Sequence, residues 1–179
     1  QLGFFLKSNQ SSEDQADSSK AFEEFKADLT EMPKGRWEVS FLTFILTERL
    51  ALRSNDELHG AMVEGLRFLF KSKLVMEGHM VNAVTNAGVF KTLGDVCVDT
   101  PKAPEWLGEL IGVALAEGSS GALLRHTLST TVSASNAEEA DEFASPVWRP
   151  IVKLMTAILS VEGVKERLPT FVESSKNAE

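Results

Sequence analysis

Residues 95–118 read DVCVDTPKAPEWLGELIGVALAEG and contain the clearest structural signals in the chain. A short apolar run ends at Val98, and Pro101 and Pro104 oppose its continuation as a helix, because proline lacks a backbone N–H group and clashes with the preceding turn. Apolar residues then recur at i, i+3, i+4 and i+7, namely Leu107, Leu110, Ile111 and Ala114. The segment therefore predicts two helices that meet at a proline corner, with one buried face on the second helix.

Helical periodicity recurs along most of the chain, and no segment alternates as a half-buried strand does. The segment 37–53 is apolar almost all round and is expected to be a central helix that is contacted on several sides. The segment 78–98 is expected to be one helix, weakened or kinked by its three glycines. The other expected helices are a short piece at 2–6 and the segments 20–32, 54–70, 107–117, 123–132, 147–158 and 161–168, the last ending at Pro169.

The order helix, tight turn, helix recurs, so the predicted architecture is all-α with about eight helices. Turn residues stand near Pro33, Ser54, Lys73, Pro101 and Ser119. Helix hairpins of this kind cannot bury their apolar faces alone and usually stack as an α-solenoid. A closed helical bundle is the alternative architecture.

The length of 179 residues and the 43% hydrophobic content suit one domain that spans residues 1–179. The first residue is Gln, which fits a domain excised from a longer scaffold protein at least as well as a processed terminus. Residues 133–144 are small, polar and acidic and are expected to form a mobile loop. Residues 173–179 are expected to form a frayed tail.

A formal charge of −8 argues against direct nucleic-acid binding, which depends on Lys and Arg, and favours a protein partner with a basic face. No apolar run is long enough to span a bilayer, and the first residues lack the order of a signal peptide. The single cysteine, Cys97, cannot form an internal disulfide, which is consistent with a reducing compartment. A cytoplasmic location is therefore expected.

No residue pattern supports catalysis. The three histidines, His59, His79 and His126, fall on three different predicted helices and have no partner at i+4. Cys97 lies in an apolar run, where burial disfavours the reactive thiolate. The chain has neither a glycine-rich phosphate loop nor metal-ligand spacing. We therefore expect no enzymatic activity, no cofactor and no metal; a small hydrolase built around Cys97 is the remaining catalytic alternative.

The corner DTPKAPEWLGEL, residues 99–110, resembles the Asp-x-Pro segment of the MI domain, also written MA-3. This domain occurs in the eukaryotic translation initiation factor 4 gamma family and in programmed cell death protein 4. The similarity has no gaps here and is greatest to plant and algal versions, in which the same Asp-x-Pro-Lys-Ala leads into an aromatic-Leu-Gly helix. The segments 41–50, 54–70, 78–98 and 123–126 follow in the family's order.

The resemblance implies a HEAT-like stack of helix hairpins without catalysis that binds a DEAD-box RNA helicase, initiation factor 4A. In that family the helicase contacts acidic residues of the first interhelical loop, which here is longer and rich in serine. The turn after the second helix and the proline corner lie on the related edge. The corresponding residues are Glu13, Asp14, Asp17, Met32, Pro33, Lys34, Asp99 and Pro101.

Two further functions stay open beside that of an initiation scaffold. One is a translation inhibitor resembling programmed cell death protein 4, and the other is a generic α-solenoid adaptor with an unrelated protein partner. The chain has no tyrosine, so it cannot carry the Tyr-containing helix with which the scaffold family holds the cap-binding factor. Contacts with other initiation factors are therefore expected through the parent protein.

Overall fold

The computed structural model describes residues 24, 27–31, 35, 37–51, 56–118, 121–137 and 148–176, and every regular element in these ranges is a helix. The all-α class predicted from the periodicity is confirmed. Residues 27–31 are helical and contribute the buried Leu29. The labelled helices are α3 (Glu38–Ala51), α4 (Asp56–Lys71), α5 (Glu77–Ala87), α6 (Leu93–Asp99), α7 (Ala103–Glu117), α8 (Ala122–Ala137), α9 (Trp148–Ser160) and α10 (Val164–Lys176).

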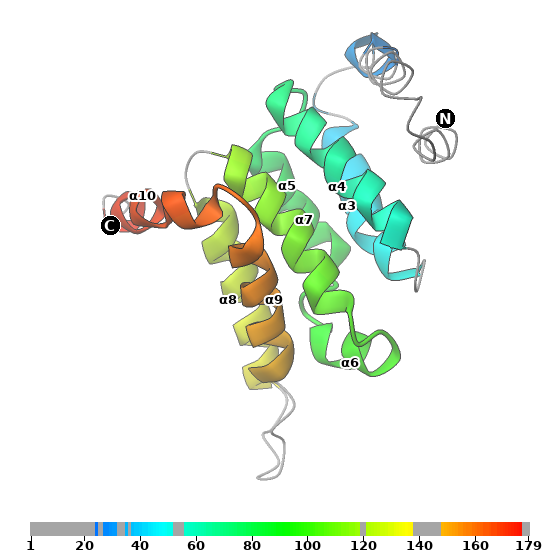
Figure 1. Cartoon of the computed structure of the whole chain (residues 1–179). Helices are drawn as coiled ribbons and strands as arrows, with labels where there is room; N and C mark the ends of the chain where they lie inside the picture. The colour runs from blue at the N-terminus through cyan, green and yellow to red at the C-terminus, as the bar shows by residue number, and fades with distance from the viewer. Residues whose placement is uncertain are drawn as a thin grey trace.

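The helices stack in two layers (Figure 1). In one layer α3 packs on α5 and α5 packs on α8, while in the other α4 packs on α7 and α7 packs on α9. The pairs α3–α4, α5–α7 and α8–α9 each place one helix in each layer. This side-by-side addition of helix pairs is the expected solenoid-like arrangement. The short α6 contacts α7 and α9 near the corner, and α10 packs on α7 and α9.

Helix α7 is the most deeply buried element of the described chain. The predicted apolar face is confirmed, because Leu107, Leu110, Ile111 and Ala114 are fully buried. The opposite side is buried too, with Trp106, Val113 and Leu115. Segment 37–53 is expected to be contacted on several sides; α3 does contact α5 and α7, but one side is open, since Phe44 is 46% exposed.

Helix α7 approaches α9 through two glycines one turn apart. A Cβ atom at Gly108 would lie 2.5 Å from the carbonyl oxygen of Leu154 and 2.7 Å from the Cβ of Ala157. A Cβ atom at Gly112 would lie 2.5 Å from Cγ2 of Val161. Real Cβ atoms essentially never come within 3.0 Å of other atoms, so the two helices can pack at this separation only because both positions are glycine.

The turn between α7 and α8 is held from a distance by Glu77, the first residue of α5. Its Oε1 accepts a hydrogen bond of 3.0 Å from the backbone N–H of Leu123. Leu123 lies in the first turn of α8, where N–H groups have no partner within the helix. Gly121 closes the same turn with a φ of +66° and lies against Phe171 of α10. The predicted separation of two helices at 118–121 is confirmed, because α7 ends at Glu117 and α8 begins at Ala122; residues 119 and 120 lie outside the described residues.

The segment 78–98 forms two helices, so the prediction of one weakened helix is wrong. Helix α5 ends at Ala87 because Gly88 adopts a left-handed conformation with φ of +68°, which glycine tolerates at little cost. The chain then turns and buries Phe90 completely before α6 starts at Leu93. Burial of a large aromatic side chain favours this break over a continuous helix.

Two predicted helix ends lie elsewhere in the structure, those of α8 and α10. Helix α8 continues to Ala137, five residues into the predicted acidic loop. Residues 133–137 include two alanines, and alanine has the highest intrinsic helix propensity, so this segment can be helical without large apolar side chains. Helix α10 passes through Pro169 and reaches Lys176, so the predicted tail is helical up to that residue. Pro169 is exposed and removes one backbone hydrogen bond, whereas continuing the helix buries Phe171.

Some predicted features lie outside the described residues. They are the helix at 2–6, the first part of the helix at 20–32, the serine cap at position 54, the acidic residues 138–142 and the serine cap at position 145.

We predict that Gly108→Ala destabilises the protein by about 1–3 kcal/mol, since the new methyl group must displace the backbone of α9. The control is Gly60→Ala in α4, where no atom lies within 4 Å of the new Cβ. That change should stabilise the helix by about 0.5–1 kcal/mol. Urea unfolding of the three proteins measures both effects, and equal free energies of unfolding would contradict the close contact of α7 with α9.

Candidate functional site

The proline corner between α6 and α7 has a defined backbone structure. The N–H of Thr100 donates to the carbonyl of Val96 at 2.8 Å, and the N–H of Ala103 donates to the carbonyl of Thr100 at 2.9 Å. Pro104 lies in the first turn of α7, where its missing N–H has no partner to lose. Thr100 is buried, whereas Asp99 and Pro101 are exposed. The corner therefore presents Asp99 and Pro101 on a fixed backbone.

Helix α9 also contributes to the corner. The ammonium group of Lys153 donates to the carbonyl oxygen of Pro101 at 3.2 Å and pairs with Oε1 of Glu105 at 3.0 Å. The side chains of Lys153 and Glu105 are 46% and 39% exposed. Lys153 thus joins α9 to the end of the turn and to the first turn of α7. Sequence reasoning missed this residue, because it lies about fifty positions away and no motif connects it to the corner.

The surface of the corner combines acidic, basic and apolar side chains. Its acidic groups are Asp95 and Asp99 on α6 and Glu105 on α7, and its basic groups are Lys102 and Lys153. Three carboxylates and two ammonium groups leave one net negative charge. Glu105 is paired with Lys153, whereas within the described ranges Asp99 forms no ion pair. Asp95 and Asp99 are both exposed and form no ion pair among the described residues, and Asp99 is the one that lies in the Asp-x-Pro segment.

Two exposed valines belong to the helices that form the corner. Val98 of α6 is 81% exposed and Val152 of α9 is 59% exposed. The expectation that the run around Cys97 is buried is therefore wrong for Val98, because α6 packs only one face on α7 and α9. That face carries the buried Leu93 and the half-buried Cys97. Val98 lies beside Asp99 in the chain and adds apolar area to the exposed edge.

Cys97 lies in an environment that disfavours the thiolate. Burial raises the pKa of its thiol; Lys153 acts in the opposite direction and Glu105 in the same direction as burial. The net pKa is higher than the usual value, so the thiol is protonated at neutral pH.

The three histidines lie on α4, α5 and α8, as predicted, and each bonds to a neighbouring group. His59 Nε2 lies 2.5 Å from Glu109 Oε2 and joins α4 to α7. His126 Nε2 lies 2.8 Å from Thr85 Oγ1 and joins α8 to α5. His79 Nδ1 accepts the backbone N–H of Met76 at 3.3 Å at the start of α5. Among the residues that the structure describes, no three His, Cys, Asp or Glu side chains are grouped to hold a metal ion.

Of the predicted contact residues, the structure places Asp99 and Pro101. The other six, namely Glu13, Asp14, Asp17, Met32, Pro33 and Lys34, lie outside the described residues.

The chain that follows the predicted contact turn is ordered around Glu38, the first residue of α3. Its buried carboxylate accepts the N–H of Gly35 at 2.9 Å. Burial raises the pKa of Glu38. Backbone hydrogen bonds, the strongest from Gly35, and the nearby His79 lower the pKa by more than burial raises it, so the net pKa lies below the usual value. The ionised form therefore stabilises the fold above the carboxyl's unfolded pKa, and this stability is lost as the pH falls through the lower folded pKa.

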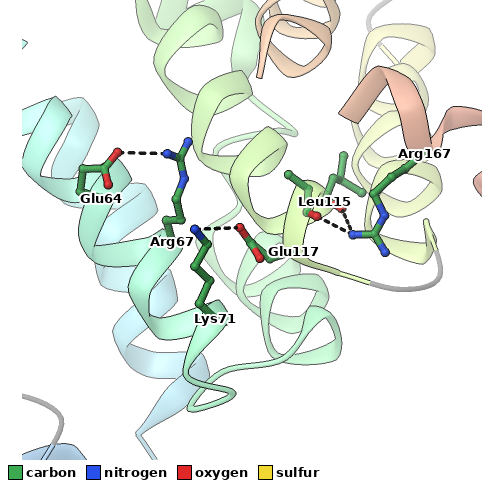
Figure 2. A network of polar contacts seen from close by, with 7 residues as sticks. Glu64, Arg67, Lys71, Leu115, Glu117 and Arg167 are labelled. Carbon is green, nitrogen blue, oxygen red and sulfur yellow. Dashed lines mark hydrogen bonds and ion pairs between the residues drawn. The ribbon is translucent and has the colours of Figure 1, made fainter. Parts of the chain in front are cut away.

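The opposite end of α7 has a different character (Figure 2). Nη1 of Arg167, on α10, donates to the carbonyl oxygens of Leu115 and Ala116, at 3.3 Å and 2.5 Å, and so binds the negative end of the α7 dipole. Lys71 of α4 lies 4.0 Å from Glu117 at the same end. The carboxylate and the backbone acceptors drawn at this end of α7 therefore have basic partners, unlike Asp99 at the corner.

Comparison with protein-family models, with curated proteins and with solved structures finds no match to this chain. None of the helices in the described ranges is both long and apolar enough to cross a membrane.

We predict that iodoacetamide alkylates native Cys97 at neutral pH several times more slowly than the urea-unfolded chain. The raised pKa leaves little thiolate, and the side chain is half-buried. The alkylation rate should still rise with pH beyond the range in which an ordinary thiol has fully ionised. Rapid stoichiometric labelling of the native protein at neutral pH would contradict this environment.

Proposed function

We propose that this chain is a non-catalytic binding domain of a translation initiation scaffold similar to initiation factor 4 gamma. Its partner is the DEAD-box RNA helicase initiation factor 4A, and its place of action is the cytoplasm. One observation carries the proposal: Asp99 is exposed and has no ion-pair partner among the described residues, at a rigid corner whose sequence resembles the Asp-x-Pro segment of MI domains.

The rigidity of the corner supports a role in binding. Backbone hydrogen bonds hold Thr100 and Ala103, and Lys153 holds the carbonyl of Pro101. A surface that is ordered before binding loses less conformational entropy when a partner docks. The exposed Val98 adds apolar area next to the carboxylate of Asp99, and such a combination suits a protein surface with basic and apolar groups.

Charge supports the same kind of partner. The chain has a formal charge of −8, and the corner carries one net negative charge. Complementary charges accelerate the encounter of two proteins and select the orientation in which they dock. A domain that binds one arrangement of the two helicase lobes better than another would shift the helicase toward that arrangement, by an amount set by the difference in affinity.

We predict that Asp99→Lys weakens binding to the helicase by about tenfold or more, because it replaces an attractive charge by a repulsive one. The matched control is Glu162→Lys, an exposed charge reversal beyond the opposite end of α9. The control should bind within about twofold of wild type, since distant surface charges are screened by salt. Isothermal titration calorimetry measures the affinities, and circular dichroism checks that both variants melt as wild type does.

A second prediction addresses the acidic residues outside the described ranges. Reversal of Glu13, Asp14 and Asp17 to lysine should leave helical content and melting nearly unchanged, because this polar, serine-rich stretch of sequence has no apolar periodicity and so is expected to contribute little to a core. It should weaken helicase binding and reduce its dependence on salt. A folded triple variant that binds like wild type would remove these three residues from the interface and leave the corner as the contact.

The same titrations separate the proposal from its alternatives. Absence of helicase binding by the wild-type domain rejects the proposal as a whole. If the domain binds, the ATPase rate of the bound helicase distinguishes an activating scaffold from an inhibitor resembling programmed cell death protein 4.

A further inference from the structure

We propose that Lys153 regulates the charge of the corner. By neutralising Glu105, it limits how strongly the corner attracts a basic partner. The inference rests on the proposed function, because it concerns the same surface and the same helicase. It adds a regulating residue from α9, a helix that the sequence motif of the corner does not include.

The geometry places the ammonium group of Lys153 between two acceptors of the corner. It lies 3.0 Å from the carboxylate of Glu105 and 3.2 Å from the carbonyl oxygen of Pro101. A lysine or arginine of a partner that approached Glu105 would meet this ammonium group first. Asp99, by contrast, is exposed and forms no ion pair among the described residues.

The contribution of Lys153 to the fold can be separated from its effect on charge. Helix α9 is held on α7 by the close backbone contact at Gly108 and Gly112 and by the burial of Leu154 and Ile158. Ion pairs between side chains as exposed as those of Lys153 and Glu105 contribute little to folding. Removal of the lysine should therefore leave α9 in place and change mainly the charge that the corner presents.

Four proteins vary this charge in single steps. Wild type carries one net negative charge at the corner. Lys153→Met keeps an apolar stem of similar length, exposes the Glu105 carboxylate and leaves two negative charges. Glu105→Gln exposes the ammonium group of Lys153 instead and leaves the corner with no net charge. The double variant returns to one negative charge, now without the ion pair.

The experiment measures binding of each protein to the helicase by stopped flow at low and at high salt. We expect Lys153→Met to associate with the helicase about two- to fivefold faster than wild type at low salt. Its association rate should also decrease more steeply as salt is added. Glu105→Gln should associate more slowly by a similar factor and depend less on salt. The double variant should resemble wild type in both respects.

A purely structural role of Lys153 predicts a different ranking of the four proteins by their binding to the helicase. If Lys153 only fixed the turn, both single variants would bind more weakly than wild type, the double variant would not recover, and the salt dependence would not change in opposite directions. That order overturns the inference, and so do four equal association rates. Binding by wild type without the expected order rejects the inference alone. Absence of binding by both wild type and Lys153→Met rejects the proposed function and the inference together.

Discussion

The backbones of α7 and α9 approach so closely at Gly108 and Gly112 that no side chain fits between them. Glycine is unfavourable inside a helix by about 1 kcal/mol relative to alanine, so each position lowers the intrinsic stability of α7. The gain is a contact along α9 that buries Leu154 and Ile158. Because α9 is fixed in this way, its first turns lie beside the corner, and α10, which follows it, reaches the other end of α7.

The two ends of α7 consequently differ. At its C-terminal end, Arg167 binds the last carbonyl groups and Glu117 lies near Lys71. At its N-terminal end, Pro104 stands in the first turn, where a backbone N–H group would have no partner within the helix. Asp99 and Pro101, which precede this turn, are exposed. One end is thus closed by contacts within the molecule, and the other keeps polar groups available for contacts outside it.

Sequence reasoning succeeded where the structure depends on neighbours in the chain. The i, i+3, i+4 and i+7 pattern in α7 and the prolines beside it were sufficient for the helix, its buried face and the corner. It failed where distant residues decide. The burial of Phe90 separates α5 from α6, and the carboxylate of Glu77 caps α8 from another helix. Lys153 could not be assigned to the corner before α9 was placed beside it.

The residues that hold the fold and those that present the candidate site are largely different. Gly108, Leu110 and Leu154 are buried, and changes there alter packing, which costs several kcal/mol in a close-packed interior. Asp99 and Lys153 are exposed, where a change of charge affects folding by about 1 kcal/mol or less. The backbone of the corner can therefore stay fixed while its charge varies, and a domain of this architecture can change how strongly it attracts a basic partner without changing how it folds.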